Sequence, residues 1–235
     1  MTLTILDGSI GQELVKRSSE APTGLWSTEV LLKQPELILA VHADYFAAGA
    51  DVATSNSYAV HRDRMARFGI DEQFEPLLMA AIELATAARD AHGSGLVAGS
   101  IGPAGWSYRP SQAPPEEQGA EIYAEVAKIL STHADVLLFE TMSSVLEAKS
   151  ALMGSRSVSK PVWLAVSVDD TDGSKLRSGE DLLDVLALAI EFRPEALLIN
   201  CSVPEAVNQS MAILDDKNLQ PMRLGAYANG FKKIT

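Results

Sequence analysis

The sequence is poor in cysteine, aromatic residues and positive charge. Cys201 is the single cysteine among 235 residues, so no disulfide can form within the chain, and this fits a reducing compartment, which we take to be the cytoplasm. Lysine and arginine number 19 against 31 aspartates and glutamates, and the formal net charge is −12. The Lys/Arg clusters that neutralise phosphates are missing, so we expect no nucleic-acid partner.

Several sequence signals of other protein classes are also absent. No segment is apolar and long enough to cross a bilayer, and the N-terminus has no signal-peptide pattern, so we expect no membrane association. No GxGxxG turn follows the first strand, which argues against a Rossmann fold, and no P-loop motif is present. No lysine stands at a strand end, which argues against a Schiff-base aldolase. The four histidines lack HExxH spacing and are expected to be surface or packing residues.

Short apolar runs alternate with segments of helical periodicity, which is typical of a parallel sheet with crossover helices. The predicted strands are Leu3–Leu6, Asp51–Ser55, Leu96–Ser100, Asp135–Phe139, Val162–Ser167, Ala196–Ile199 and Arg223–Ala226. Seven such units predict a TIM barrel rather than an open sheet. The eighth unit is not among these residues, so we expect one barrel domain over residues 1–235 that is incomplete at its C-terminal end.

Residues with preferences for helix ends agree with this pattern. Ser143 or Ser144 is expected to cap the helix that follows, Pro35 suits a first helical turn, and Gly49 suits a helix end. The long loop 102–115 after the third predicted strand is interpreted either as a functional lid or as a surface insertion.

Polar residues follow the predicted strands where their carboxyl ends meet. They are Asp7, Gly8, Asn56, Ser100, Glu140, Thr141, Ser167, Asp169, Asn200, Cys201 and Asn229. In TIM barrels the chemistry lies at this end of the strands. The sequence therefore predicts a site there.

Two of these residues invite a functional and a structural interpretation. Glu140 directly follows an apolar strand, where a carboxylate is costly without a partner. Either it caps the helix that begins near Ser143, or it joins Asp7 in binding a cationic group such as an ammonium. Cys201 taken alone is better explained as an inert core cysteine, but its position at the carboxyl end of a predicted strand shifts the balance toward a site residue.

A set of short motifs, in order along almost the whole chain, resembles the homocysteine S-methyltransferase family. The motifs are Asp7-Gly8-Ser9-Ile10-Gly11-Gln12-Glu13-Leu14, Leu25-Trp26-Ser27, His42-Ala43-Asp44-Tyr45, Ala48-Gly49-Ala50-Asp51, Thr54-Ser55-Asn56-Ser57-Tyr58, Phe139-Glu140-Thr141 and Ile199-Asn200-Cys201. Ser9 and Gln12 replace the glycine and threonine usual in the family, and Leu198-Ile199 stands where Gly-Val is common.

The resemblance implies a (β/α)8 barrel that holds zinc through three cysteines. Cys201 matches the first, and the other two belong to a later Cys-Cys motif that these residues do not reach, so the zinc site is expected to be incomplete. In such a site zinc deprotonates the substrate thiol, which then attacks a methyl group. The implied reaction transfers a methyl from an onium-type donor to homocysteine and gives methionine, as in methionine biosynthesis.

The resemblance also implies roles for the remaining candidates. Asp7 and Glu140 hold the substrate ammonium, and Gly8 permits close approach. Thr141 and Asn200 contact the substrate, and Tyr58 and Trp26 line the donor pocket, because aromatic faces favour onium cations. The expected partners are a small thiol acceptor and a methyl donor, and a homo-oligomer is compatible with this interpretation.

Two alternatives remain open. A non-catalytic barrel that binds an amino acid or a partner protein would need no complete zinc site. A TIM-barrel lyase or hydrolase would use Asp7 and Glu140 as acid and base.

Overall fold

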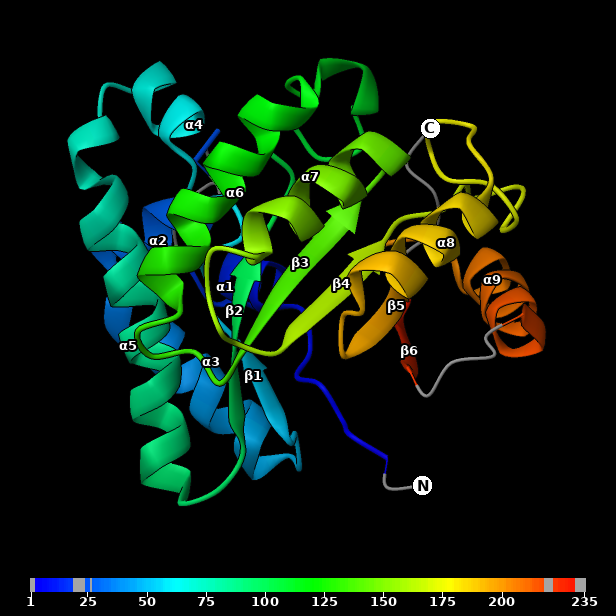
Figure 1. Cartoon of the computed structure of the whole chain (residues 1–235). Coiled ribbons are helices and arrows are strands. Elements are labelled where there is room, and N and C mark those ends of the chain that lie inside the picture. The colour runs from blue at the N-terminus through cyan, green and yellow to red at the C-terminus, as the bar shows by residue number, and fades with distance from the viewer. Residues whose placement is uncertain (1–2, 19–23, 26, 218–221, 231–235) are drawn as a thin grey trace. The chain divides into compact units, whose positions relative to one another are not determined.

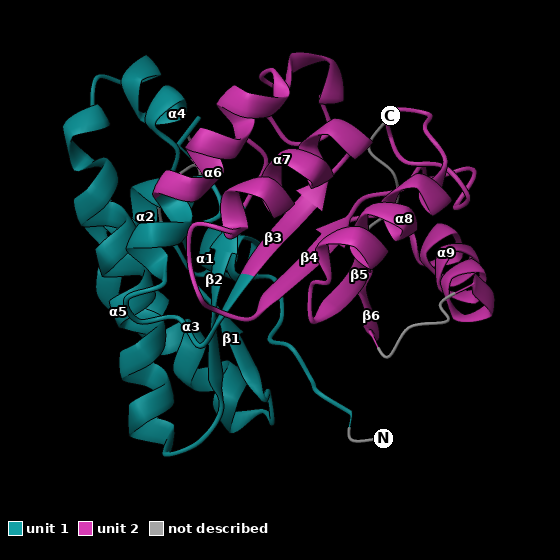
Figure 2. Ribbon diagram, viewed as in Figure 1, with its two compact units in different colours: residues 1–101, 126–137 teal, residues 102–125, 138–235 magenta. Residues whose placement is uncertain are grey.

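The computed structural model describes residues 3–18, 24–25, 27–217 and 222–230. Contacts divide the chain into two compact units (Figure 2). Unit 1 comprises residues 1–101 and 126–137, and unit 2 comprises residues 102–125 and 138–235. Both units are α/β, as the alternating pattern predicted.

Unit 1 is mainly helical around the first two strands (Figure 1). Its elements are α1 (Ile10–Arg17), α2 (Ser27–Lys33), α3 (Pro35–Ala47), β1 (Val52–Thr54), α4 (Arg62–Arg67), the 3-10 helix η1 (Asp71–Gln73), α5 (Phe74–His92) and β2 (Leu96–Ile101). β1 and β2 pair in parallel, with Val52 opposite Leu96. Phe46 of α3, Ala53 of β1 and Ala88 of α5 form a buried cluster that joins helix to strand.

Two elements are divided between the units, and unit 2 contains those that remain. α6 (Glu116–Leu130) and β3 (Val136–Met142) belong partly to each unit. Unit 2 continues with the 3-10 helix η2 (Pro110–Gln112), α7 (Val145–Ser155), β4 (Val162–Val166), α8 (Leu182–Phe192), β5 (Ala196–Asn200), α9 (Pro204–Lys217) and β6 (Arg223–Tyr227). β4 pairs in parallel with β5, and β5 with β6.

The strands of unit 2 neighbour one another in chain order. Every residue of β5 is buried, and so is all of β4 except its first residue. Such continuous apolar runs are typical of parallel strands covered by helices on both faces. Because parallel strands in chain order align their carboxyl ends, residues that follow β3 and β5 come together at one edge.

The prediction of seven strands is wrong in one place. The described residues form six named strands, and the expected strand Leu3–Leu6 is reduced to an isolated bridge between Leu6 and Val52. Leu3 and Ile5 are 80% and 51% exposed, so this segment lacks the burial that stabilises a strand. The amide of Ile5 instead bonds to the Asp51 carboxylate at 2.8 Å.

The predicted helix ends are confirmed. Ser144 is the N-cap of α7 and its hydroxyl accepts from the amide of Glu147. Pro35 begins α3, and Gly49 after it has φ of +101°, a conformation that glycine adopts without strain. Glu147, in the first turn of α7, accepts from the amide of Ser143 at 2.7 Å. The capping interpretation of Glu140 is therefore wrong, because Ser144 is the N-cap and the carboxylate that binds the amide before it is that of Glu147.

Among the residues that the structure describes, none of the helices combines the length and the apolar character that a membrane span requires.

Candidate functional site

A polar cluster in unit 2 lies where β3 and β5 end. Glu140 and Thr141 belong to β3, Asn200 is the last residue of β5, and Cys201 follows it directly. The fully buried amide of Asn200 links them: its oxygen accepts from the backbone amide of Thr141 at 3.2 Å. Its nitrogen lies 3.1 Å from the Thr141 hydroxyl, 3.4 Å from Glu140 Oε2 and 3.4 Å from Cys201 Sγ. The Asn200 side chain therefore contacts both the Glu140 carboxylate and the Cys201 thiol.

The Cys201 thiol is a weak acid in this environment. Burial raises the pKa of the thiol from 9.0 to about 11, and the negative charge of Glu140 adds to the increase. Hydrogen bonds from Thr141, at 3.4 Å, and from Tyr108 oppose the shift, as does the charge of Arg177. The thiol is therefore protonated at neutral pH, and a nearby cation would favour its thiolate form.

The Glu140 carboxylate is half-buried beside neutral hydrogen-bond donors. Tyr227 at the end of β6 donates its hydroxyl to Glu140 Oε2 at 2.8 Å, and the Asn200 amide donates to the same oxygen. A carboxylate oriented by these two donors suits an acceptor for a cationic ligand group.

Cys201 and two residues that contact its thiol have left-handed backbone conformations. Thr141, Cys201 and Tyr108 have φ values of +65°, +51° and +62°. Such values are rare for residues other than glycine, above all for a β-branched threonine, and tend to occur at functional sites.

A second polar cluster, in unit 1, surrounds Asp7. The Asp7 carboxylate accepts from the backbone amide and from the hydroxyl of Thr54, each at 2.8 Å. Its Oδ2 lies 4.0 Å from Nδ1 of His42, and both side chains are almost fully buried. Burial lowers the pKa of His42 to about 4, so the imidazole is neutral at neutral pH and this contact is not an ion pair.

The remaining candidates of unit 1 lie near Asp7 in the chain or after β1. A Cβ at Gly8 would come within 2.7 Å of the Tyr45 ring, so this position accepts only glycine without movement of the ring. Tyr58 is half-buried in the turn after β1. Trp26 lies outside the described residues.

Comparison with known proteins identifies the family. The family model described as homocysteine S-methyltransferase matches residues 4–234. The chain belongs to the homocysteine S-methyltransferase family. Homocysteine S-methyltransferase of Escherichia coli K12 is 32% identical over 94% of this chain and 76% of the relative. Homocysteine S-methyltransferase YbgG of Bacillus subtilis is 32% identical over 85% of this chain and 69% of the relative.

A solved structure of this family is similar in fold to this chain. The metallated form of the homocysteine methyltransferase MmuM from Escherichia coli superimposes with a TM-score of 0.84 and 31% identity, and covers 97% of this chain and 84% of that chain. The predictions of the family and of an enzyme within it are therefore confirmed.

The described residues do not by themselves complete a metal site. A catalytic zinc takes three protein ligands, and nowhere in the described part of the chain do three His, Cys, Asp or Glu side chains gather in a way that would hold an ion. Cys201 is the one cysteine of the 235 residues. Of the three cysteine ligands that the family resemblance implied, these 235 residues contain only Cys201.

The structure brings together four of the predicted site residues in unit 2, namely Glu140, Thr141, Asn200 and Cys201. Asp7 and Gly8 belong to unit 1, and their expected place in the same site stays a prediction. Sequence reasoning missed Tyr227, because the predicted strand ended one residue earlier, at Ala226. It also missed Tyr108 and Arg177, which lie in loops without a recognisable motif.

Proposed function

We propose that this chain transfers a methyl group to the thiol of homocysteine. The supporting observation is the cluster in which one amide, that of Asn200, contacts both the Glu140 carboxylate and the Cys201 sulfur. A ligand bearing an ammonium and a thiol matches these two groups: the ammonium pairs with Glu140, and the ligand sulfur lies toward Cys201.

Each residue has a distinct task in this proposal. Glu140 holds the substrate ammonium, and the Tyr227 hydroxyl orients the carboxylate through its hydrogen bond. Thr141 and Asn200 orient Cys201 through their contacts with its sulfur. Asp7 and Gly8 contribute to amino-acid binding, and Tyr58 and Trp26 line the side from which an onium-type donor approaches.

The metal and the architecture belong to the same proposal. We propose zinc as the metal and Cys201 as one of its ligands, supported by the metallated form of the related enzyme. The 235 residues supply one thiolate, so no catalytic step is assigned to the metal. The family fold that we propose is a (β/α)8 barrel, and the single cysteine supports a cytoplasmic location.

The test varies the enzyme and the acceptor together. Glu140→Gln removes the negative charge but keeps the shape of the side chain, and 4-mercaptobutyrate is homocysteine without its ammonium. We expect Glu140→Gln to weaken homocysteine binding by about 2 kcal/mol or more, roughly 30-fold in KM, because a partly desolvated charge pair is lost. The KM for 4-mercaptobutyrate should change little. Glu191→Gln, on the exposed side of α8, is the matched control.

The assay measures methionine formed from homocysteine with a panel of onium, corrinoid and folate methyl donors. An equal increase in KM for homocysteine and for 4-mercaptobutyrate would show that Glu140 does not bind the ammonium. Homocysteine binding without methyl transfer from any donor would instead favour a non-catalytic, amino-acid-binding barrel, which the incomplete ligand set makes the second candidate.

A further inference from the structure

The chain makes a tight turn where it leaves β5, and Cys201 lies at its most strained point. The backbone of Cys201 has φ of +51°, a conformation that a residue with a Cβ adopts only when its surroundings impose it. The Cys201 amide donates to the carbonyl of Tyr227 at 3.2 Å. That bond fixes the peptide group before the Cys201 Cα and leaves the peptide group after it to be fixed by other residues.

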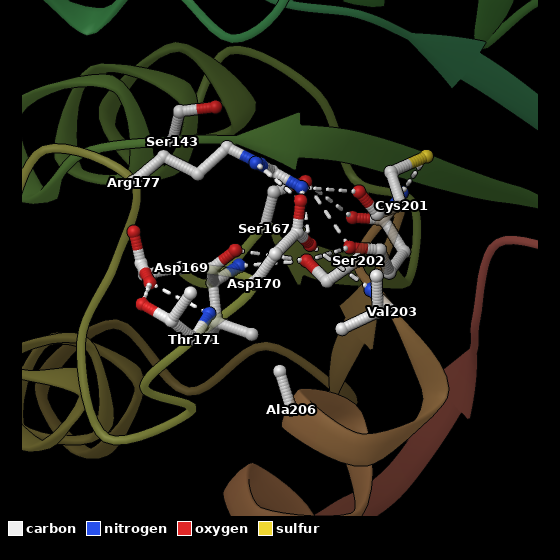
Figure 3. A network of polar contacts seen from close by, with 12 residues as sticks. Ser143, Ser167, Asp169, Asp170, Thr171, Arg177, Cys201, Ser202, Val203 and Ala206 are labelled. Atoms are coloured by element: carbon white, nitrogen blue, oxygen red, sulfur yellow. Dashed lines mark hydrogen bonds and ion pairs between the residues drawn. The ribbon is translucent and has the colours of Figure 1, made fainter. Parts of the chain in front are cut away.

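An ion pair from the loop after β4 holds the turn at two points (Figure 3). Arg177 Nη2 donates to the Cys201 carbonyl at 2.9 Å. Asp170 Oδ1 accepts from the amide of Val203, two residues later, at 3.0 Å. The two side chains also bind each other through two contacts, Nη2 to Oδ1 at 3.0 Å and Nη1 to Oδ2 at 3.3 Å. The pair therefore connects the carbonyl of Cys201 to the amide of Val203 through one rigid unit.

The pair is well placed to resist relaxation of the turn. The side chains of Asp170 and Arg177 are only 7% and 18% exposed, so solvent screens their attraction weakly. The ring of Tyr108 packs against the guanidinium at 4.7 Å. A planar guanidinium that forms a two-point contact with a carboxylate also fixes direction, which an ammonium does not.

The loop that carries Arg177 is itself anchored near the site. The Ser178 amide donates to the carbonyl of Ser143, which lies just before the N-cap of α7, at 3.0 Å. Ser202 ties the turn to the same loop, because its hydroxyl accepts from the amide of Val168 at 2.9 Å. The turn and the loop after β4 are thus joined by hydrogen bonds on both sides of the ion pair.

We infer that Asp170 and Arg177 are positioning residues that hold Cys201 in its left-handed conformation and so aim its sulfur at Thr141 and Asn200. Without the pair, the backbone of Cys201 relaxes toward negative φ and the sulfur leaves these contacts. The catalytic consequence rests on the proposed function: methyl transfer loses kcat while KM for homocysteine changes little, because Glu140 is untouched. A misplacement of about 1 Å can cost on the order of 100-fold in rate, and we expect about 10-fold or more.

The single cysteine makes the inference directly measurable. Biosynthetic labelling with ¹³C-cysteine gives one residue's signals, and the Cα and Cβ shifts depend on the backbone angles of that residue. We expect Arg177→Met to move or broaden the Cys201 signals at a temperature where circular dichroism shows the variant to be folded. Arg177→Lys keeps one donor and the charge, and should shift the signals less in the same direction.

The matched control is Lys175→Gln, which removes an ion pair of the same loop, Lys175 with Asp181, without touching the turn. It should leave the Cys201 signals in place even if it lowers the melting temperature. Unchanged signals in folded Arg177→Met and Arg177→Lys would overturn the inference and leave the pair with a purely stabilising role. The spectra do not depend on catalysis, so absence of methyl transfer by the wild-type chain would count against the proposed function alone.

Discussion

His42 makes the stability of this protein depend on pH in a predictable way. The side chain lies on α3, is fully buried, and neither ring nitrogen has a hydrogen-bond partner among the residues described. Burial removes the solvation that an imidazolium needs and lowers the pKa of His42 from 6.5 to about 4. Asp7, at 4.0 Å, is the acidic group that faces it.

The direction and size of the effect follow from proton linkage. Between pH 4 and 6.5 the unfolded chain binds a proton at His42 that the folded chain rejects, so the free energy of unfolding increases with pH across this window. The contribution is complete above pH 6.5 and is lost as the pH falls toward 4. Each pKa unit is worth about 1.4 kcal/mol, so the full effect is about 3 kcal/mol.

Urea unfolding of the wild-type chain and of His42→Gln between pH 4 and 7.5 measures this dependence. The variant cannot gain the proton, so its free energy of unfolding should vary less with pH by up to about 3 kcal/mol. His133→Gln, at an exposed histidine, is the control and should follow the wild type. Parallel curves for wild type and His42→Gln would refute the argument that burial suppresses protonation.

Three further substitutions test local features. Thr54→Val removes the hydroxyl that donates to Asp7 and should lower the free energy of unfolding by about 2 kcal/mol; Thr54→Ser keeps the donor, and an equal loss there would contradict the assignment. Ser144→Ala removes the N-cap of α7 and should lower the free energy of unfolding, measured with urea, by about 1 kcal/mol. An unchanged free energy of unfolding would contradict the capping role. Gly154→Ala places a Cβ 2.7 Å from the carbonyl oxygen of Ala120 on α6. Although alanine is the better helix former, this close contact should lower the free energy of unfolding by about 1–3 kcal/mol and with it the melting temperature. A higher melting temperature would disprove the close packing.

The apolar strand cores were predictable because burial on both faces demands continuous apolar runs. The runs at Val136–Phe139 and Ala196–Ile199 are strands in the structure. The run at Leu3–Leu6 is also mainly apolar, but only Leu6 forms a bridge with β1. Nothing within that short segment distinguishes a buried strand from an exposed one, since the difference lies in what covers it.

The sequence predicted which strand-end residues form the candidate site, but it did not predict the hydrogen bonds that join them. Glu140 and Cys201 stand directly after apolar runs, and parallel strands carry such residues to one edge. The contacts of Asn200, by contrast, join residues about 60 positions apart. Arg177 reaches Cys201 across 24 positions from a loop with no distinguishing motif, so its role could not be derived from local pattern.

The sequence by itself determined the α/β class, the helix ends at Ser144, Pro35 and Gly49, and the family, because these depend on local preferences and on motifs in register. Only the tertiary structure decided which polar groups meet, which of them are ionised, and which backbone is strained. Burial and hydrogen bonding set the charge state of His42 and of Cys201, and both depend on side chains that other segments of the chain bring into contact.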